Sequence, residues 1–350
     1  MVSALDFRAM EACEDDLSAF KECFERNGTP RQLDALRWQY LENPTGELFV
    51  ALALSDERIA AIYAVQPAFV QLRGARVLAA QSVDTLVDVD FRGRGLFTKM
   101  AEAVYHRVRS AEAAFVYGFP NASSAPGFFD KLGWSSLDPV PFLVKPLRTG
   151  FLASKLPLGR WLRRLPDLRL PIGGPRLQAD QVLRPVTDFG LDLDDLWKRF
   201  ASNVRVAVDR DPQYLRWRLA KPQQHYVCLG VFEGARLVAF CAYTTLDKHG
   251  GRIGYILELL HDPDRHETGA ALLVESLRRM AADGADVVLA WAFGHSPNAE
   301  AYAKAGFMPL PERLRPIELH IGVRPLNESL TEVLSDRRNW YVSYCDSDTV

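Results

Sequence analysis

One pattern occurs twice in this sequence, and it constrains the fold more than any other feature. Three kinds of anchor recur: a tryptophan that precedes a proline and a run of alternating apolar residues, a glycine that opens a helical pattern, and a Lys-x-Gly-aromatic segment. Their positions are Trp38 and Trp217, Gly95 and Gly269, and Lys131 and Lys304. The separations lie between 173 and 179 residues. Anchors that keep nearly one offset predict two copies of a module.

The composition excludes several classes of protein. A net charge of −2 lacks the basic excess of a general nucleic-acid binder. The five cysteines form no Cys-x-x-Cys pair, and His261 and His266 are five residues apart rather than four, so we expect neither a disulfide framework nor a metal site. No apolar run reaches 18 residues, and the first residues resemble no export signal. We therefore expect a cytoplasmic protein without stable membrane insertion.

Each copy is predicted to be a mixed α/β module. In the α+β arrangement that we expect, helices pack on a sheet that contains both parallel and antiparallel strands. Apolar alternation predicts strands, and apolar residues three or four apart predict helices. In the first copy we expect strands at 48–54, 58–65, 77–89 and 113–119, and helices at 14–26, 95–110 and 124–132. In the second copy we expect strands at 226–232, 236–244, 252–261 and 286–292, and helices at 269–282 and 297–305.

The repeat divides the chain into a first module at 1–147, a connector at 148–178 and a second module at 179–350. From Ser135 to Arg176 there are eight Lys or Arg and two Asp, with many prolines. We interpret this stretch as a connector. A phosphate-binding rim and an amphipathic helix on a membrane surface are the alternatives. The aromatic segment 339–348 is expected to dock as a strand.

The strongest chemical signal follows the third predicted strand, where Arg92-Gly-Arg-Gly95 precedes an amphipathic helix. Such a turn directs backbone N–H groups and a helix N-terminus at one point, which suits a pyrophosphate. Glycine allows the backbone to approach the phosphate without a Cβ in the way. A second element follows at Asn121 and at Phe129-Asp-Lys-Leu-Gly-Trp134.

Together these two elements resemble the GNAT superfamily of acyl-CoA-dependent N-acetyltransferases. Arg92 and Gly95 match the family's Arg/Gln-x-x-Gly-x-Gly/Ala loop, whereas Phe97 departs from its small third residue. Asn298 and the segment from Tyr302 to Phe307 repeat the second element in the second copy. The resemblance implies acetyl-CoA as cofactor and a set of residues that contact it. These are Leu86, Val87, Val89, Arg92, Gly93, Arg94, Gly95, Leu96, Phe97, Asn121 and Phe129.

The two copies are not equivalent at the loop. His266 replaces Arg92, and Glu267 puts a carboxylate where a pyrophosphate would arrive. We therefore expect only the first copy to hold acetyl-CoA. The second copy is interpreted as a degenerate module that completes the acceptor site or only stabilises the first.

Two residues are candidates for proton transfer. Family members often carry a tyrosine that protonates the leaving thiolate. At that position the first copy has Phe129 and the second has Tyr302, which would serve only if it reaches across. The strand Thr85–Val89 is expected to offer a backbone N–H to the thioester carbonyl. Asp84 is the candidate base, with a strand-end carboxylate paired to an arginine as the alternative.

The acceptor is expected to be a small-molecule amine. The resemblance to bacterial surface-polysaccharide transferases suggests a nucleotide-linked amino sugar. Candidate acceptor residues, with core or connector roles as alternatives, are Trp38, Tyr40, Trp217, Arg163 and Arg164. The predicted function is N-acetyl transfer from acetyl-CoA to a primary amine. The alternatives are a non-catalytic CoA-binding or scaffold protein and an aminoacyl-transferring tandem GNAT protein.

Overall fold

The computed structural model describes residues 5–150 and 167–350, which form two compact units. The first unit comprises Met1–Pro139, Lys221–Gln223 and Leu319–Asn339; the second comprises Val140–Ala220, Gln224–Glu318 and Trp340–Val350. Each unit therefore contains segments that are far apart in the sequence. Within the described residues, no helix is both long enough and apolar enough to cross a membrane.

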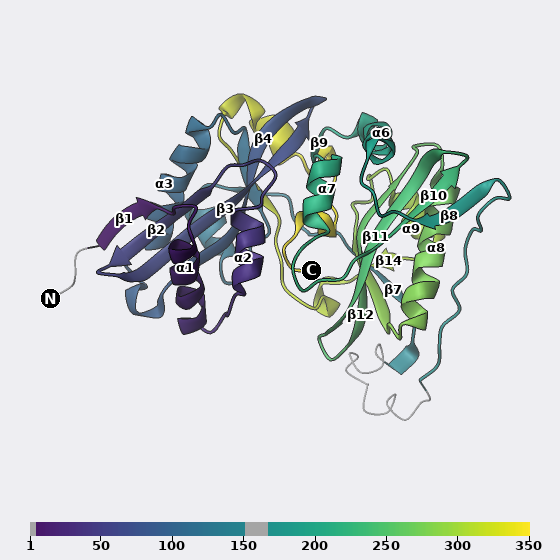
Figure 1. Ribbon diagram of the computed structural model, residues 1–350, viewed down its shortest axis with the longest axis horizontal. Helices are drawn as coiled ribbons and strands as arrows, with labels where there is room; N and C mark the ends of the chain where they lie inside the picture. The colour runs from purple at the N-terminus through teal and green to yellow at the C-terminus, as the bar shows by residue number, and fades with distance from the viewer. Residues whose placement is uncertain (1–4, 151–166) are drawn as a thin grey trace. The chain divides into compact units, whose positions relative to one another are not determined.

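The first unit is a mixed sheet with helices on both faces (Figure 1). Its strands follow the order β1-β2-β3-β4-β5-β15-β6, and neighbours are antiparallel except for the parallel pair β4 and β5. The strands are β1 (Leu5–Ala9), β2 (Phe49–Ser55), β3 (Arg58–Leu72), β4 (Ala75–Val87), β5 (Phe115–Gly118), β6 (Ser135–Ser136) and β15 (Gly322–Pro325). The helices are α1 (Glu14–Arg26), α2 (Leu33–Tyr40), α3 (Leu96–Ser110) and α10 (Thr331–Ser335).

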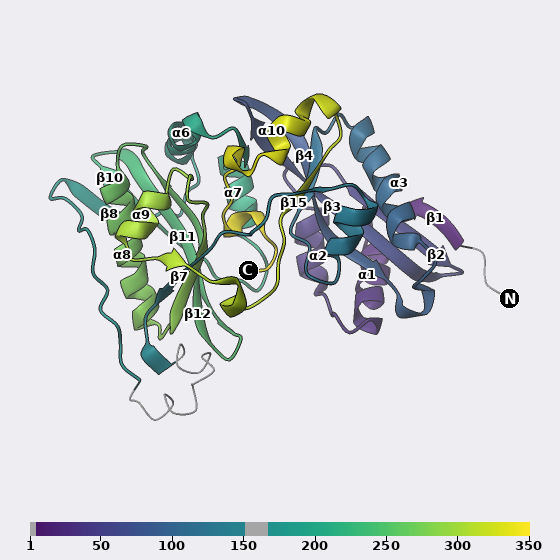
Figure 2. The same ribbon diagram turned by 180° about the vertical axis from the view of Figure 1, so that it is seen from behind.

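Each face of this sheet buries its own core. On one face α3 packs against β2, β3 and β4 through the buried stripe Leu96, Met100, Val104 and Val108 (Figure 2). On the other face α1 and α2 pack through Phe20 and Leu36. Alternate residues of β2 face the two cores, because successive strand side chains point to opposite faces. The apolar spacing in 95–110 therefore predicts this helix and its buried side correctly.

The second unit repeats this plan with the strand order β14-β7-β13-β12-β11-β10-β8. The strands of this sheet are β7 (Phe142–Pro146), β8 (Gln181–Pro185), β10 (Val227–Glu233), β11 (Arg236–Lys248), β12 (Gly251–His261), β13 (Val287–Trp291) and β14 (Met308–Pro309). The short strand β9 (Val206–Val208) does not belong to this sheet. Its helices are α6 (Leu191–Phe200), α7 (Pro212–Arg218), α8 (His266–Ala282) and α9 (Ala299–Lys304). The parallel pair here is β12 and β13, and α8 packs on β10, β11 and β12.

In each sheet, the strand that flanks the parallel pair on one side comes from a distant part of the chain. In the first unit β15 pairs antiparallel with β5, and in the second unit β7 pairs antiparallel with β13. The strand that flanks the parallel pair thus comes from the later sequence in one unit and from the earlier sequence in the other. The predicted mixed α/β class is confirmed, whereas the sequence repeat does not reveal this exchange.

The end of the chain corrects one expectation. We expected 339–348 to dock as a strand. Instead the segment is buried and irregular, with a single bridge between Val206 and Trp340 and a 3-10 turn at Tyr344–Asp346. The side chain of Ser343 and the carboxylate of Asp346 cap this turn, so local polar contacts replace a strand ladder.

Candidate active site

The site of the first unit begins where β4 and β5 separate. Their parallel pairing covers Ala80–Val116, Gln81–Tyr117 and Ser82–Gly118, and there it ends. Directly beyond, β4 carries a bulge, since Val83 and Asp84 together oppose a single residue of β3. A bulge bends a strand and redirects its side chains. The two strands therefore diverge at their carboxyl ends.

This divergence opens a cavity of about 760 Å³, enough for a small-molecule site. All of its lining residues belong to the first unit. The aromatic and aliphatic part of the lining includes Phe24, Leu86, Val87, Phe97, Phe119, Phe128 and Trp134. The polar part includes Thr29, Ser82, Asp84, Arg92, Asn121, Ser123, Ser124 and Lys131.

The loop before α3 forms one rim of the cavity. Gly93 and Gly95 have φ angles of +76° and +71°, a left-handed conformation that favours glycine. No atom lies within 4 Å of where their Cβ atoms would be, so this loop is open. Gly95 leads into α3 without a side-chain cap, and the exposed Arg92 lines the cavity. An open helix start beside a guanidinium has the chemistry to hold a phosphate anion.

Asp84 lies in the cavity wall and is 6% exposed. Its Oδ2 accepts hydrogen bonds from Tyr40 Oη at 2.7 Å, Arg31 Nη2 at 2.9 Å and Gln39 Nε2 at 3.3 Å. The arginine pairing that we considered as the alternative is therefore present. It coexists with a position in the cavity, so the carboxylate is both fixed in place and next to the space that a substrate would fill.

The predicted cofactor residues separate into three groups. Leu86, Val87, Arg92, Phe97 and Asn121 line the cavity. The remaining loop residues are not part of the lining: Gly93, Arg94 and Gly95 are exposed, Val89 is 59% exposed and Leu96 is buried. Phe129 is absent from the lining, and its neighbour Phe128 is present.

Asn121 also has a local structural role. Its Oδ1 accepts hydrogen bonds from the backbone N–H groups of Ser123 and Ser124 and from the Ser123 hydroxyl. The carboxyamide therefore fixes the turn that leads into the π-helical segment Gly127–Lys131. Ser123, Ser124 and Lys131, which sequence reasoning missed, enter the cavity wall through this turn.

The proposed acceptor residues do not present open aromatic faces. Trp38, Tyr40 and Trp217 are 5%, 4% and 8% exposed. Tyr40 packs on Phe20 in a core and directs its hydroxyl at Asp84. Arg163 and Arg164 lie outside the described residues. The core interpretation of the aromatic residues agrees with this burial.

In the second unit, the chain's own end occupies the place where β12 and β13 diverge. Their pairing covers Ile253–Val287 to Tyr255–Leu289. The Tyr344 ring stacks on Trp291 with 4.4 Å between centroids, and it meets Tyr255 edge-on. A segment of the protein therefore fills the space that corresponds to the cavity of the first unit.

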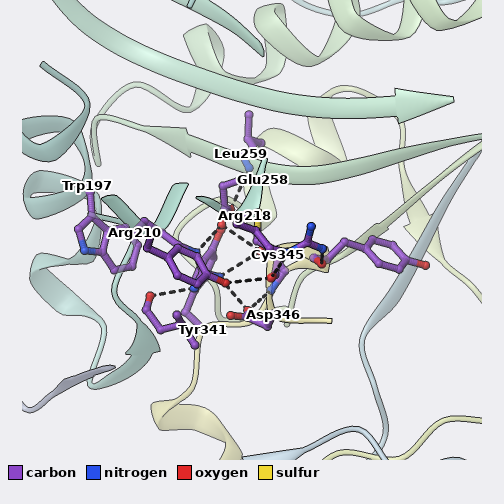
Figure 3. Close-up of polar contacts among 12 residues, drawn as sticks. Trp197, Arg210, Arg218, Glu258, Leu259, Tyr341, Cys345 and Asp346 are labelled. Carbon is purple, nitrogen blue, oxygen red and sulfur yellow. Dashed lines mark hydrogen bonds and ion pairs between the residues drawn. The ribbon is translucent and has the colours of Figure 1, made fainter. Parts of the chain in front are cut away.

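A buried charge cluster fixes this segment (Figure 3). Arg210 is fully buried and donates to Glu258 at 2.7 Å and to Asp346 at 2.7 Å. Tyr341 donates to the same Glu258, and Arg218 donates to the backbone carbonyl of Cys345. Burial acts to lower the pKa of Arg210, but the carboxylates outweigh it and raise the pKa well above the ordinary value.

The start of α8 is also closed. A Cβ on Gly269 would lie 2.4 Å from the His261 ring, which therefore occupies the space over the helix. Burial is the main cause that lowers the pKa of His261, to about 4. Glu267 is ion-paired with Lys304. The second unit thus lacks the open, positively charged helix start of the first.

Tyr302 belongs to the core of the second unit. It is 2% exposed and packs edge-on against Phe307 at 5.2 Å between centroids. Burial raises its pKa well above the ordinary tyrosine value. The hydroxyl is therefore a poor proton donor at neutral pH.

Comparison with known families and structures agrees with the site. A family model described as an acetyltransferase (GNAT) domain matches residues 10–137. This match spans the diverging strands, the Arg92–Gly95 loop and Asp84. No curated protein sequence matches the chain. Residues 10–137 of the first unit are therefore similar to a GNAT acetyltransferase domain.

Solved structures share the fold over most of the chain. A GCN5-related N-acetyltransferase from Anabaena variabilis is 11% identical, with a TM-score of 0.64, covering 92% of this chain and 73% of that one. Saccharomyces cerevisiae N-myristoyltransferase with bound myristoyl-CoA is 13% identical, with a TM-score of 0.60 and coverage of 93% and 80%. A probable N-acyltransferase from Enterococcus faecalis is 10% identical, with a TM-score of 0.62 and coverage of 93% and 73%. The domain match and these folds support an acyltransferase enzyme.

Proposed function

We propose that the protein transfers an acetyl group from acetyl-CoA to a primary amine in the cavity of the first unit. The observation that carries this proposal is one continuous cavity wall. It includes Arg92 beside the open loop, the diverging edge of β4, and Asp84. An arginine beside the open loop, several aromatic and aliphatic side chains and a fixed carboxylate thus border the same space.

The residues present fit acyl-CoA. The open backbone at Gly93 and Gly95 and the Arg92 guanidinium would hold the pyrophosphate. Phe97, Phe128 and Leu86 would contact the pantetheine arm. The bound cofactor supplies a thioester carbonyl that is activated toward amines. Acetyl-CoA is proposed as the acyl donor on the sequence resemblance.

Two groups of the chain would act on the reaction. Backbone N–H groups of β4 beyond Ser82 would donate to the carbonyl oxygen as it gains charge, an interaction worth roughly 3–4 kcal/mol of barrier. Asp84 would accept the proton that the attacking nitrogen loses. The three donors at its Oδ2 keep that carboxylate in one orientation.

The second unit is proposed to be a degenerate GNAT module. Its strand divergence is filled by the chain's own segment around Tyr344, and His261 covers the start of α8. We therefore propose that it binds no acyl-CoA. A nucleotide-linked amino sugar as acceptor stays a prediction from the sequence, since its aromatic candidates are buried.

Release of free CoA thiol from acetyl-CoA tests the proposal. The purified chain should release thiol only when an amine is present, and the acetylated amine should appear in equal amount. The panel should contain free and nucleotide-linked amino sugars. If CoA binds but no amine in the panel is acetylated, the non-catalytic CoA-binding alternative is favoured instead.

A further inference from the structure

The first unit contains a histidine–aspartate pair beside the cavity wall. His320 Nδ1 lies 2.7 Å from Asp138 Oδ2, and the backbone N–H of Ile321 donates to Asp138 Oδ1 at 2.8 Å. An ionised carboxylate only accepts hydrogen bonds, so Nδ1 carries a proton toward Asp138. Such a pair fixes the orientation of the imidazole.

The sheet register places this pair at the end of β5. His320 continues the β15 ladder: its N–H donates to the Pro120 carbonyl at 2.9 Å, and Leu319 bridges to Asn121. Pro120 and Asn121 both line the cavity. Residues that oppose each other across a ladder project from the same face, so His320 and Pro120 share a face of the sheet.

The ring of Phe129, from the π-helical segment Gly127–Lys131, packs on the same face of the sheet. A Cβ on Gly322, two residues after His320, would lie 2.7 Å from the Phe129 ring. The Phe129 and His320 rings meet edge-on, with 6.0 Å between centroids. Phe129 occupies the position at which the resembling family often carries its acidic tyrosine. The structure therefore brings a protonatable side chain next to the position that lacks one.

We infer that the His320–Asp138 pair donates the proton to the leaving thiolate. This inference rests on the proposed function. When the amine nitrogen forms its bond to the acyl carbon, the carbon–sulfur bond breaks and its electron pair goes to sulfur. The His320 imidazolium gives its Nε2 proton to that sulfur and regains a proton from solvent. The proton of the amine goes separately to Asp84.

The surroundings of the pair are consistent with this role. Arg337 donates to the backbone carbonyls of Asp138 and Pro139 and so holds the segment that carries the carboxylate. The His320 and Asp138 side chains are 29% and 31% exposed, so protons can be exchanged with solvent. The other histidine of the first unit, His106, lies on the exposed side of α3 and provides a matched control.

The test compares binding of CoA and of desulfo-CoA, which lacks the sulfur, by titration calorimetry. The wild-type chain should bind CoA several-fold more tightly, because the imidazolium donates to the sulfur. His320→Gln should remove this preference and leave the affinity for desulfo-CoA unchanged. His106→Gln should behave as wild type. A His320→Gln chain that keeps the full preference overturns the inference.

Turnover gives a second readout. His320→Gln should lower kcat with acetyl-CoA by about 10- to 100-fold, with the KM for acetyl-CoA within about twofold. Adding Phe129→Tyr in that background should restore much of kcat by supplying a hydroxyl. Asp138→Asn, which keeps the imidazole, should give a smaller loss and serves if His320→Gln fails to fold.

Failure of the inference and failure of the proposed function give different results. If the wild-type chain neither binds CoA nor acetylates an amine, the proposed function is wrong. If the wild type does both and neither variant changes the sulfur preference or kcat, the assignment of His320 and Asp138 alone is wrong.

Discussion

At the scale of single residues, Asp84 is the group on which the chemistry depends most. Asp84→Asn keeps the shape of the side chain and removes its ability to accept a proton. We expect kcat to fall by about 10²- to 10⁴-fold, with the affinity for CoA unchanged. Steady-state kinetics and calorimetry measure both quantities. Asp90→Asn, at an exposed carboxylate nearby, is the control. A loss below about threefold would show that solvent accepts the proton.

The sequence predicts Asp84 as a candidate but not the residues that hold it. Its position eight residues before Arg92 is visible in the sequence. Arg31 and Tyr40 lie 53 and 44 residues away from it, and nothing local indicates that they converge on one carboxylate oxygen. Tyr40 is a candidate acceptor residue in the sequence, with a core role as the alternative; its ring is buried and its hydroxyl donates to Asp84. Aromatic residues with a polar tip fit either role, so the sequence alone does not decide between them.

His261 predicts a pH dependence of stability. Its folded pKa of about 4 lies below the ordinary value of 6.5 because the ring is buried. The unfolded chain therefore binds the proton first as the pH falls. The stability that the neutral ring contributes is complete above pH 6.5 and is lost toward pH 4, a change on the order of 3 kcal/mol.

Denaturant unfolding at pH 7 and pH 5 measures this change. His261→Gln, which cannot become charged, should unfold with a smaller difference between the two pH values than wild type. His106→Gln should keep the wild-type difference. If the His261 variant also keeps it, the ring does not remain neutral in the folded protein.

At the scale of elements, local patterns identify the longest strands of each sheet and the helices α1, α3, α8 and α9. The helix predicted at 14–26 is α1, and the one predicted at 95–110 begins one residue later as α3. The pairing of β15 with β5 and of β7 with β13 is not visible in the sequence, because strands pair across long separations. The helices α2, α6, α7 and α10 were missed; α2, α7 and α10 have only eight, seven and five residues and so show little periodicity.

The buried cluster around Arg210 predicts that removing its cation lowers the stability of the fold. Arg210→Met leaves Glu258 and Asp346 as buried carboxylates without their cation. This change should lower the free energy of unfolding by about 3–5 kcal/mol. Chemical denaturation measures it. Arg338→Met, at an arginine whose side chain is 81% exposed, should change stability by less than about 0.5 kcal/mol. Equal losses in the two variants would contradict a structural role for the cluster.

At the scale of the whole molecule, two units share one strand plan and differ at the place where the parallel strands diverge. The first unit has a cavity there with an open glycine loop. In the second unit, Tyr344 and its neighbours fill that place, and His261 covers the helix start. We therefore predict one acyl-CoA site for each chain, although the architecture occurs twice.

Calorimetric titration with CoA measures the number of sites in the wild-type chain and in two matched variants. Gly95→Asp puts a carboxylate in the open loop. Gly46→Asp is the control, because the new residue must adopt the same left-handed backbone at an exposed turn where no atom lies within 4 Å of the Cβ position. We predict one CoA per chain for wild type and Gly46→Asp, and no binding for Gly95→Asp. Two CoA molecules per chain, or full binding by Gly95→Asp, would contradict the account.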